Sequence, residues 1–292
     1  MVATFEYRRA ASVPEAIEIL SASGPDAKVL AGGQSLIALI NLGLARPSVL
    51  VDINGIASLD SMEEVDGELV VGATARHAAA LSSATVRRCC PLLAEAMPLI
   101  GDRQVRNRGT IGGSVAHADP VAEIPTVATC LGATMRLAGA AGTREVSAAD
   151  FFVTYLTTAI GEGELLTHVR FPKSPPSAGV SFQELVRRKG DFAIVAAAAS
   201  VALDSRGACA DVRLALAGVD ATPRFAAEAA QVLVGHEPTS ERIREAARAA
   251  CADIAPESDI MASGEYRKAM AEVYARRSLD QAVQRAQANA RV

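Results

Sequence analysis

Apolar positions in the opening third of the chain alternate between a helical and a strand period. Ser12, Pro14 and Glu15 form the pattern of a capped helix start, and the apolar face that follows ends at Gly24 and Pro25. Shorter apolar runs then predict strands over residues 28–30, 48–53 and 68–72, and a longer run predicts a helix over residues 36–44. This part of the chain therefore combines short helices with buried strands.

The middle of the chain predicts more helices and a second group of strands. The helical stretches are residues 74–81, 87–95, 98–100 and 122–131, and the strands are residues 135–137, 144–146 and 165–171. Between them, residues 101–114 are polar, basic and rich in glycine, which predicts an ordered loop system.

A proline-rich segment, residues 172–177, is the strongest linker signal and predicts a domain boundary. Three strands are expected after it, over residues 180–187, 193–203 and 210–218. Helices are expected over residues 226–234 and 240–252 and from residue 265 to the end. Helices segregated after a sheet indicate an α+β fold.

Composition narrows the functional classes. The 292 residues are 50% hydrophobic and 21% charged with a net charge of −4, which argues against intrinsic disorder and against a nucleic-acid partner. Five scattered cysteines do not resemble a disulfide framework, so we expect reduced thiols and a cytoplasmic protein. We expect no membrane insertion, since no apolar run is long enough. Neither iron–sulfur nor zinc ligand spacing occurs, so an organic cofactor must carry any electrons.

Two glycine pairs carry the candidate chemistry. They lie in the segments Ala31-Gly32-Gly33-Gln34-Ser35 and Thr110-Ile111-Gly112-Gly113-Ser114, each expected between a strand and a helix. Glycine lets successive backbone N–H groups point at an anion, which predicts a pyrophosphate site if the segments converge. The alternative is that each pair serves only a tight turn. Neither segment has the glycine spacing of a Rossmann unit.

The two segments, extended to Val29–Leu36 and Gln104–Pro120, make the chain resemble the FAD-binding medium subunit of the molybdenum hydroxylases, the group of xanthine dehydrogenase and aerobic carbon monoxide dehydrogenase. The resemblance covers essentially the whole chain. It implies a two-lobed FAD-binding domain of the PCMH type, with lobes at residues 1–58 and 59–174. An α+β C-terminal domain with a three-stranded sheet and helices then follows over residues 177–292.

The resemblance also implies which residues contact the cofactor. They come from both glycine segments and from positions spaced along the rest of the chain: Val29, Leu30, Ala31, Gly32, Gly33, Gln34, Ser35, Leu36, Ile100, Thr110, Ile111, Gly112, Gly113, Ser114, His117, Asp119, Glu123, Leu166, Glu184 and Phe192. Phe192 matches an aromatic position that lies against the isoalloxazine. Glu184 stands where several relatives carry lysine. No residue is assigned a catalytic role, and no metal ligand is expected in this chain.

Each of these residues also has a structural interpretation. His117 is a candidate for a hydrogen-bonded structural histidine, Phe192 for a core residue, Glu123 for an exposed charge and Leu166 for strand packing. The arginines near the second segment, Arg103, Arg106 and Arg108, would either add positive potential or be surface charges.

The resemblance implies a function in a larger complex. The chain is expected to take electrons from [2Fe-2S] clusters on a small partner and pass them to an acceptor, while a large partner oxidises the substrate at a molybdenum cofactor. A dimer of heterotrimers is expected. The FAD should be non-covalent, because residues 31–36 contain neither His nor Cys. The alternatives are a self-sufficient FAD oxidase or dehydrogenase and a scaffold without FAD.

Overall fold

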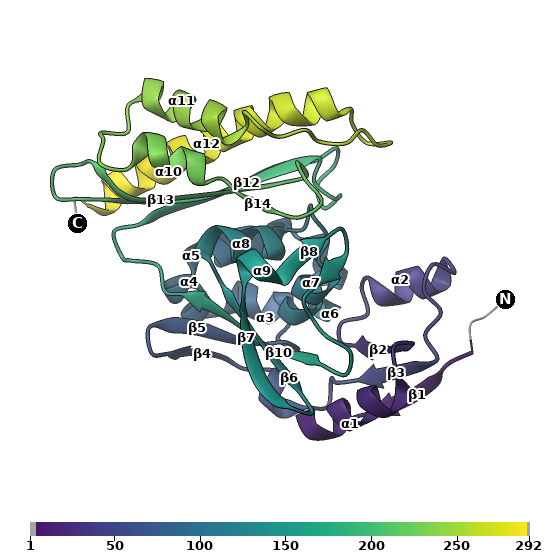
Figure 1. Ribbon diagram of the computed structural model, residues 1–292. Helices are drawn as coiled ribbons and strands as arrows, with labels where there is room; N and C mark the ends of the chain where they lie inside the picture. Colours follow the sequence, from purple (N-terminus) through teal and green to yellow (C-terminus); the bar gives the residue numbers. More distant parts are fainter. Residues whose placement is uncertain (1–3, 291–292) are drawn as a thin grey trace.

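The computed structural model describes residues 4–290. Residues 1–3 and 291–292, at the outer ends of the expected domains, lie outside this range. Within the described residues, three larger β-sheets follow one another along the chain, and β8 and β9 form a further two-stranded sheet (Figure 1). The first is parallel, in the order β1 (Glu6–Arg9), β3 (Val49–Asp52), β2 (Ala27–Leu30). Helix α1 (Val13–Ser23) packs against it, and Ser12 caps that helix as the sequence predicted.

The second sheet is antiparallel. Its order is β4 (Met62–Val65), β5 (Glu68–Gly72), β10 (Leu165–Pro172), β6 (Thr134–Gly139), β7 (Gly142–Ser147). Short helices and a hairpin surround it: α3 (His77–Ser82), α4 (Ala84–Cys89), α5 (Pro91–Ala96), α6 (Arg103–Arg108), α7 (Ile111–His117), α8 (Glu123–Leu131), α9 (Ala148–Phe151), β8 (Phe152–Thr154) and β9 (Thr157–Thr158). Short 3-10 turns lie at Ala57–Leu59 and Met97–Leu99.

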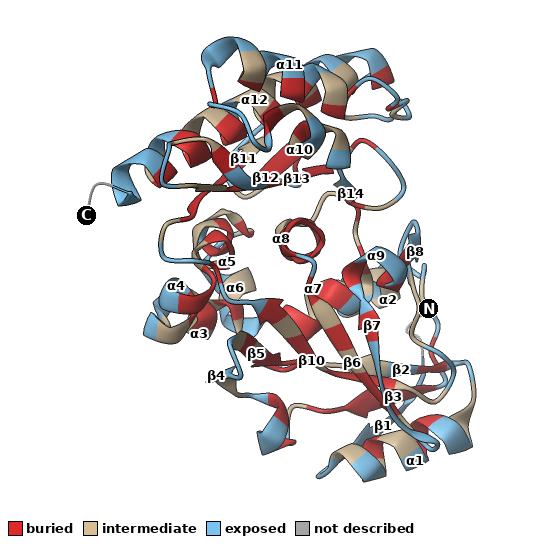
Figure 2. Cartoon of the chain, turned by 60° about the vertical axis from the view of Figure 1, so that its left-hand side comes forward, coloured by how far each residue is buried: buried red, intermediate tan, exposed pale blue. Residues whose placement is uncertain are grey.

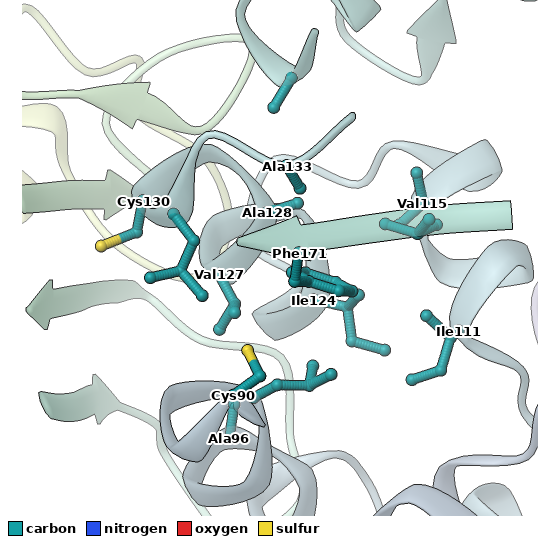
Figure 3. Close-up of a cluster of buried hydrophobic side chains, with 14 of the residues drawn as sticks. Cys90, Ala96, Ile111, Val115, Ile124, Val127, Ala128, Cys130, Ala133 and Phe171 are labelled. Atoms are coloured by element: carbon teal, nitrogen blue, oxygen red, sulfur yellow. The ribbon is translucent and has the colours of Figure 1, made fainter. Parts of the chain in front are cut away.

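A close-up of the central core shows Phe171 of β10 beside Ile124 and Ala128 of α8 (Figure 3). Ile111 and Val115 of α7 belong to the same cluster. All five side chains are completely buried. Packing of this kind fixes α7 and α8 against the sheet, and these two helices carry several of the predicted site residues.

The C-terminal sheet has the order β11 (Gly179–Leu185), β12 (Val195–Leu203), β13 (Cys209–Ala217), β14 (Arg224–Phe225). Helix α12 (Gly264–Asn289) packs on β11 and β12, with α10 (Ala227–Leu233) and α11 (Ser240–Ala250) beside it. The opposite face rests on α8, whose residues are almost all buried (Figure 2). Since both faces of the sheet are covered, β12 is apolar except for the buried Ser200.

The structure corrects three predictions of local structure. Residues 87–95 do not form one helix, because Pro91 has no N–H to continue α4 and instead begins α5. The segment predicted as a loop system contains α6 and α7, capped by Asp102 and Thr110. The C-terminal sheet has four strands rather than three, since the two residues of β14 are too few to produce a pattern.

Besides β14, the strands β1, β4, β8 and β9 were not predicted. All four side chains of β1 are exposed, so this strand lacks the alternation of buried and exposed positions that marks a half-buried strand. Only the first residue of β4 is partly buried. Within residues 4–290, no helix is long and apolar enough to cross a membrane.

Candidate active site

A cavity of about 860 Å³ lies where the first two sheets and the loop between β11 and β12 meet. Its volume falls within the range of small-molecule sites. Most of the predicted cofactor contacts line it: Val29, Ala31, Gly32, Gly33, Gln34, Ser35, Leu36, Ile100, Thr110, Gly112, Gly113, Ser114, His117, Asp119, Glu123, Leu166 and Phe192. The fold therefore brings both glycine segments to one cavity, although they lie far apart in the sequence.

Three predicted residues do not line the cavity. Ile111 is completely buried in the central core, because the first turn of α7 points it away from the opening. Leu30 belongs to β2, and its carbonyl oxygen accepts a hydrogen bond from the N–H of Ile53. Glu184 is half-buried on β11, outside the lining.

The first glycine segment leaves its backbone donors free. Among the residues that the structure describes, the N–H groups of Gly32, Gly33, Gln34 and Ser35 have no protein acceptor, and all four residues line the cavity. Gly33 has a φ of +75°, a conformation that favours glycine. Successive free N–H groups at a turn form an anion-binding concavity. This segment can therefore hold a pyrophosphate.

The second glycine segment differs from the prediction. The N–H of Ile111 donates to Ala75 O (2.9 Å), that of Gly112 to Ala73 O (3.1 Å), and those of Gly113 and Ser114 to Thr110 (3.0 Å each). These N–H groups are therefore not free to bind an anion, because they start α7. Gly112 is required by packing, since a Cβ there would lie 2.5 Å from Ala73. The second segment therefore contributes its small glycine residues and the Ser114 side chain to the wall of the cavity.

Two carboxyl groups are largely buried here, Glu123 in the lining of the cavity and Glu184 on β11 outside the lining. Burial raises the pKa of Glu123, the first residue of α8, to about 7, with a further contribution from the nearby charges of Glu184 and Asp119. Burial also raises the pKa of Glu184 to about 7, and its Oε2 atom is buried without a hydrogen-bond partner. Both carboxyls therefore hold a proton to a higher pH than an exposed glutamate does. Glu123 is not the exposed charge of the structural interpretation.

Other predicted residues have distinct local roles. Asp119 Oδ1 accepts from the Val121 N–H (3.0 Å), which supports the loop before α8. Arg106 donates to the carbonyl oxygens of Ile100 and Gly101 (2.8 and 2.9 Å), whereas none of Arg103, Arg106 and Arg108 lines the cavity. Phe192 is 69% exposed at the cavity rim, so it is not a core residue.

His77 was not among the residues predicted for the site. This histidine lines the cavity, is buried, and has no hydrogen-bond partner for either ring nitrogen. Burial lowers its pKa to about 4, so the ring is neutral at pH 7. A Cβ at Gly109 would lie 2.7 Å from His77 Cε1, so the ring packs directly on that glycine. No local pattern around His77 predicts this, because the contact joins α3 to a residue far along the chain.

Comparison with known proteins identifies the family. Residues 3–174 match the family described as FAD binding domain in molybdopterin dehydrogenase, and residues 180–282 match the CO dehydrogenase flavoprotein C-terminal domain. The chain is 38% identical over 283 residues to the 6-hydroxypseudooxynicotine dehydrogenase complex subunit alpha of Paenarthrobacter nicotinovorans, covering 97% of this chain and 96% of that one. It is 39% identical to the carbon monoxide dehydrogenase medium chain of Afipia carboxidovorans, covering 97% and 98%.

A solved structure agrees with these matches. A chain of the carbon monoxide dehydrogenase from Hydrogenophaga pseudoflava superposes with a TM-score of 0.95 at 37% identity, covering 98% of this chain and 99% of that one. The predicted α+β class, the FAD cofactor and the assignment to the oxidoreductases are thereby confirmed. The chain belongs to the family of FAD-binding medium subunits of molybdenum hydroxylases.

Proposed function

We propose that this chain receives electrons from [2Fe-2S] clusters on a small partner subunit and passes them to an external acceptor. In this proposal the substrate is oxidised at a molybdenum cofactor on a large partner subunit. The relatives support it, since they are named as medium chains or complex subunits of dehydrogenases. Bound FAD supplies the exchange between one-electron and two-electron steps. The protein contributes the site and its electrostatics.

The observation that carries the proposal is the row of free N–H donors from Gly32 to Ser35 at the cavity. These four residues would hold the FAD pyrophosphate, with Ser114 facing them from α7. Charge-assisted hydrogen bonds to backbone N–H groups are stronger than neutral ones, so such a row favours a doubly charged pyrophosphate. Phe192 at the rim would cover the isoalloxazine. The remaining predicted residues that line the cavity would complete the contacts.

The organisation of the complex is part of the same proposal. Residues 1–58 and 59–174 would form the two lobes around FAD, and residues 177–292 the C-terminal domain. The large and small partners would join this chain in a heterotrimer, and two heterotrimers would pair. The five cysteines are all buried and unpaired, which fits the cytoplasmic location expected from the sequence.

The first experiment is to purify the full chain, record its visible spectrum, and identify the chromophore released by acid with mass spectrometry. Flavin absorption bands and free FAD in the acid supernatant are expected. A folded protein that stays colourless after FAD is added would contradict the proposal.

Electron entry is tested next, by mixing the flavin-loaded chain anaerobically with the reduced small subunit. Bleaching of the flavin is expected with that partner. Bleaching by small reducing substrates, such as aldehydes or N-heterocycles, without any partner would instead favour a self-sufficient oxidase or dehydrogenase.

A further inference from the structure

A chain of hydrogen bonds joins the two glycine segments outside the cavity. It runs from the carbonyl oxygen of Ala31, through the side chains of Asn54 and Arg76, to the carbonyl oxygen of Arg108. Neither Asn54 nor Arg76 lines the cavity. Any influence of these two side chains on a bound cofactor must therefore act through the segments that they hold.

Asn54 anchors the first segment. Its Nδ2 donates to Ala31 O (2.9 Å) and to Asp52 Oδ1 (2.6 Å), and its backbone N–H donates to the same carboxylate oxygen (2.8 Å). The other oxygen of Asp52 accepts from the Tyr7 hydroxyl on β1. The amide of Asn54 is thus held at the end of β3, next to the turn that carries the free N–H donors.

Arg76 anchors the second segment in two ways. Its backbone forms an antiparallel bridge with Thr110, flanked by bonds from His77 N to Gly109 O (3.1 Å) and from Ile111 N to Ala75 O (2.9 Å). Its guanidinium donates through Nη1 to Arg108 O and through Nη2 to Asn54 Oδ1 (2.6 Å). One planar fork therefore holds the second segment directly and the first segment through Asn54, and the single ammonium group of a lysine does not reproduce this fork geometry.

We propose that Asn54 and Arg76 are a pair of positioning residues that hold the two glycine segments in the arrangement required to bind FAD. This inference rests on the proposed function, because it concerns the affinity of the same cavity. The backbones of the two segments are in direct contact, since a Cβ at Gly32 would lie 2.5 Å from Arg108 O. Loss of the fork lets Arg108 O move away from Gly32, and the free N–H row shifts relative to α7.

The test titrates the full chain, stripped of flavin, with FAD and follows the quenching of flavin fluorescence. The variants are Asn54→Ala, Arg76→Met, the double variant and Arg76→Lys, with the thermal midpoint of each apoprotein measured in parallel. Arg87→Met is the matched control, because this exposed arginine also donates to a backbone carbonyl, that of Leu81, but lies away from the cavity.

Each single variant is expected to weaken FAD affinity by about tenfold, which corresponds to about 1.4 kcal/mol. The double variant should be no weaker than the worse single variant, because both side chains act through one shared hydrogen bond. Arg76→Lys should recover part of the affinity. The thermal midpoints of the apoproteins should stay close to that of the unchanged chain, and Arg87→Met should bind FAD normally.

Unchanged FAD affinity in both single variants would overturn the inference, and so would fully additive losses in the double variant. If Arg76→Met fails to fold, Arg76→Lys decides, since it keeps the charge and the side-chain stem. Normal FAD affinity in the folded Arg76→Lys variant would then contradict the positioning role of Asn54 and Arg76. If the unchanged chain binds no FAD, the proposed function fails and this inference falls with it, an outcome visible before any variant is compared.

Discussion

A Cβ atom on Gly32 would lie 2.5 Å from the carbonyl oxygen of Arg108, a distance at which one of the two backbones must move. The first glycine segment therefore packs directly on Arg108, which lies just before the second glycine segment. Gly32 is required by this contact between chain segments, whereas Gly33 is required by its positive φ. The two glycines of one pair thus meet different physical demands.

The substitution Gly32→Ala should separate the segments. We expect FAD affinity to fall by about tenfold or more. Overpacking should lower the free energy of unfolding by about 1–3 kcal/mol. FAD titration and denaturant unfolding of the apoprotein measure the two effects. Gly207→Ala is the control, because Gly207 has open space around it in the turn after β12, and its positive φ makes alanine unfavourable there without any contact to the cavity. It should lose stability and keep its FAD affinity, and equal FAD losses in both variants would contradict the interpretation.

Phe192 lines the cavity while 69% of it is exposed, so its role in binding can be separated from stability. Phe192→Ala should change the free energy of unfolding by no more than about 0.5 kcal/mol. It should nevertheless weaken FAD binding by several-fold and shift the flavin absorption bands, since an aromatic contact contributes about 0.5–1.5 kcal/mol. Tyr155→Ala removes another exposed aromatic that does not line the cavity, and it should leave both flavin readouts unchanged. An unshifted spectrum with full affinity in Phe192→Ala would remove this residue from the site.

The raised pKa values of Glu123 and Glu184 predict a pH dependence of stability. Both carboxyls titrate near 7 in the folded chain and near 4.5 when unfolded. Between these values the folded state binds more protons, so the stability of the apoprotein should fall as pH rises from about 4.5 to 7 and then level off. Glu184→Gln should flatten this slope and raise the thermal midpoint at pH 8 relative to the unchanged chain.

Thermal unfolding between pH 4.5 and 8 measures this effect. Glu237→Gln, which alters an exposed glutamate, serves as the control and should keep the slope of the unchanged chain. The same slope in Glu184→Gln would show that Glu184 does not titrate as a buried group.

Arg267 ties α12 to the C-terminal sheet, and its loss should affect stability alone. This arginine is buried and donates to Ile194 O and to Asp259 Oδ2 (2.6 Å). In Arg267→Met, water can replace the arginine at Asp259, which is half exposed, but Ile194 O loses this donor. The loss should lower the free energy of unfolding by about 1–3 kcal/mol. Urea unfolding checks this value, and FAD titration should show unchanged affinity. A loss of FAD affinity would mean that the C-terminal sheet controls the cavity more directly than its contacts indicate.

Much of the local structure could be predicted because its signals lie within a few residues. Ser12 caps α1 through a bond from the Glu15 N–H (3.3 Å), and the strand over residues 68–72 ends at the predicted positions. Helices α6 and α7 also carry local cap signals, since Asp102 and Thr110 accept from N–H groups three residues later. Their glycine and arginine content outweighed these caps and led to the wrong prediction of a loop.

The sequence by itself determined that two glycine segments exist, in which order they occur and which family they resemble. Only the tertiary structure decided that the first segment keeps its N–H groups free while the second uses them to start α7. It also decided that Glu123 is buried where the charge of Glu184 raises its pKa further, and that His77 packs on Gly109. The physical reason is the sequence distance over which residues interact. A cap or a turn is determined by hydrogen bonds between residues a few positions apart. The availability of a donor or the pKa of a carboxyl depends on which distant residues the fold brings against it.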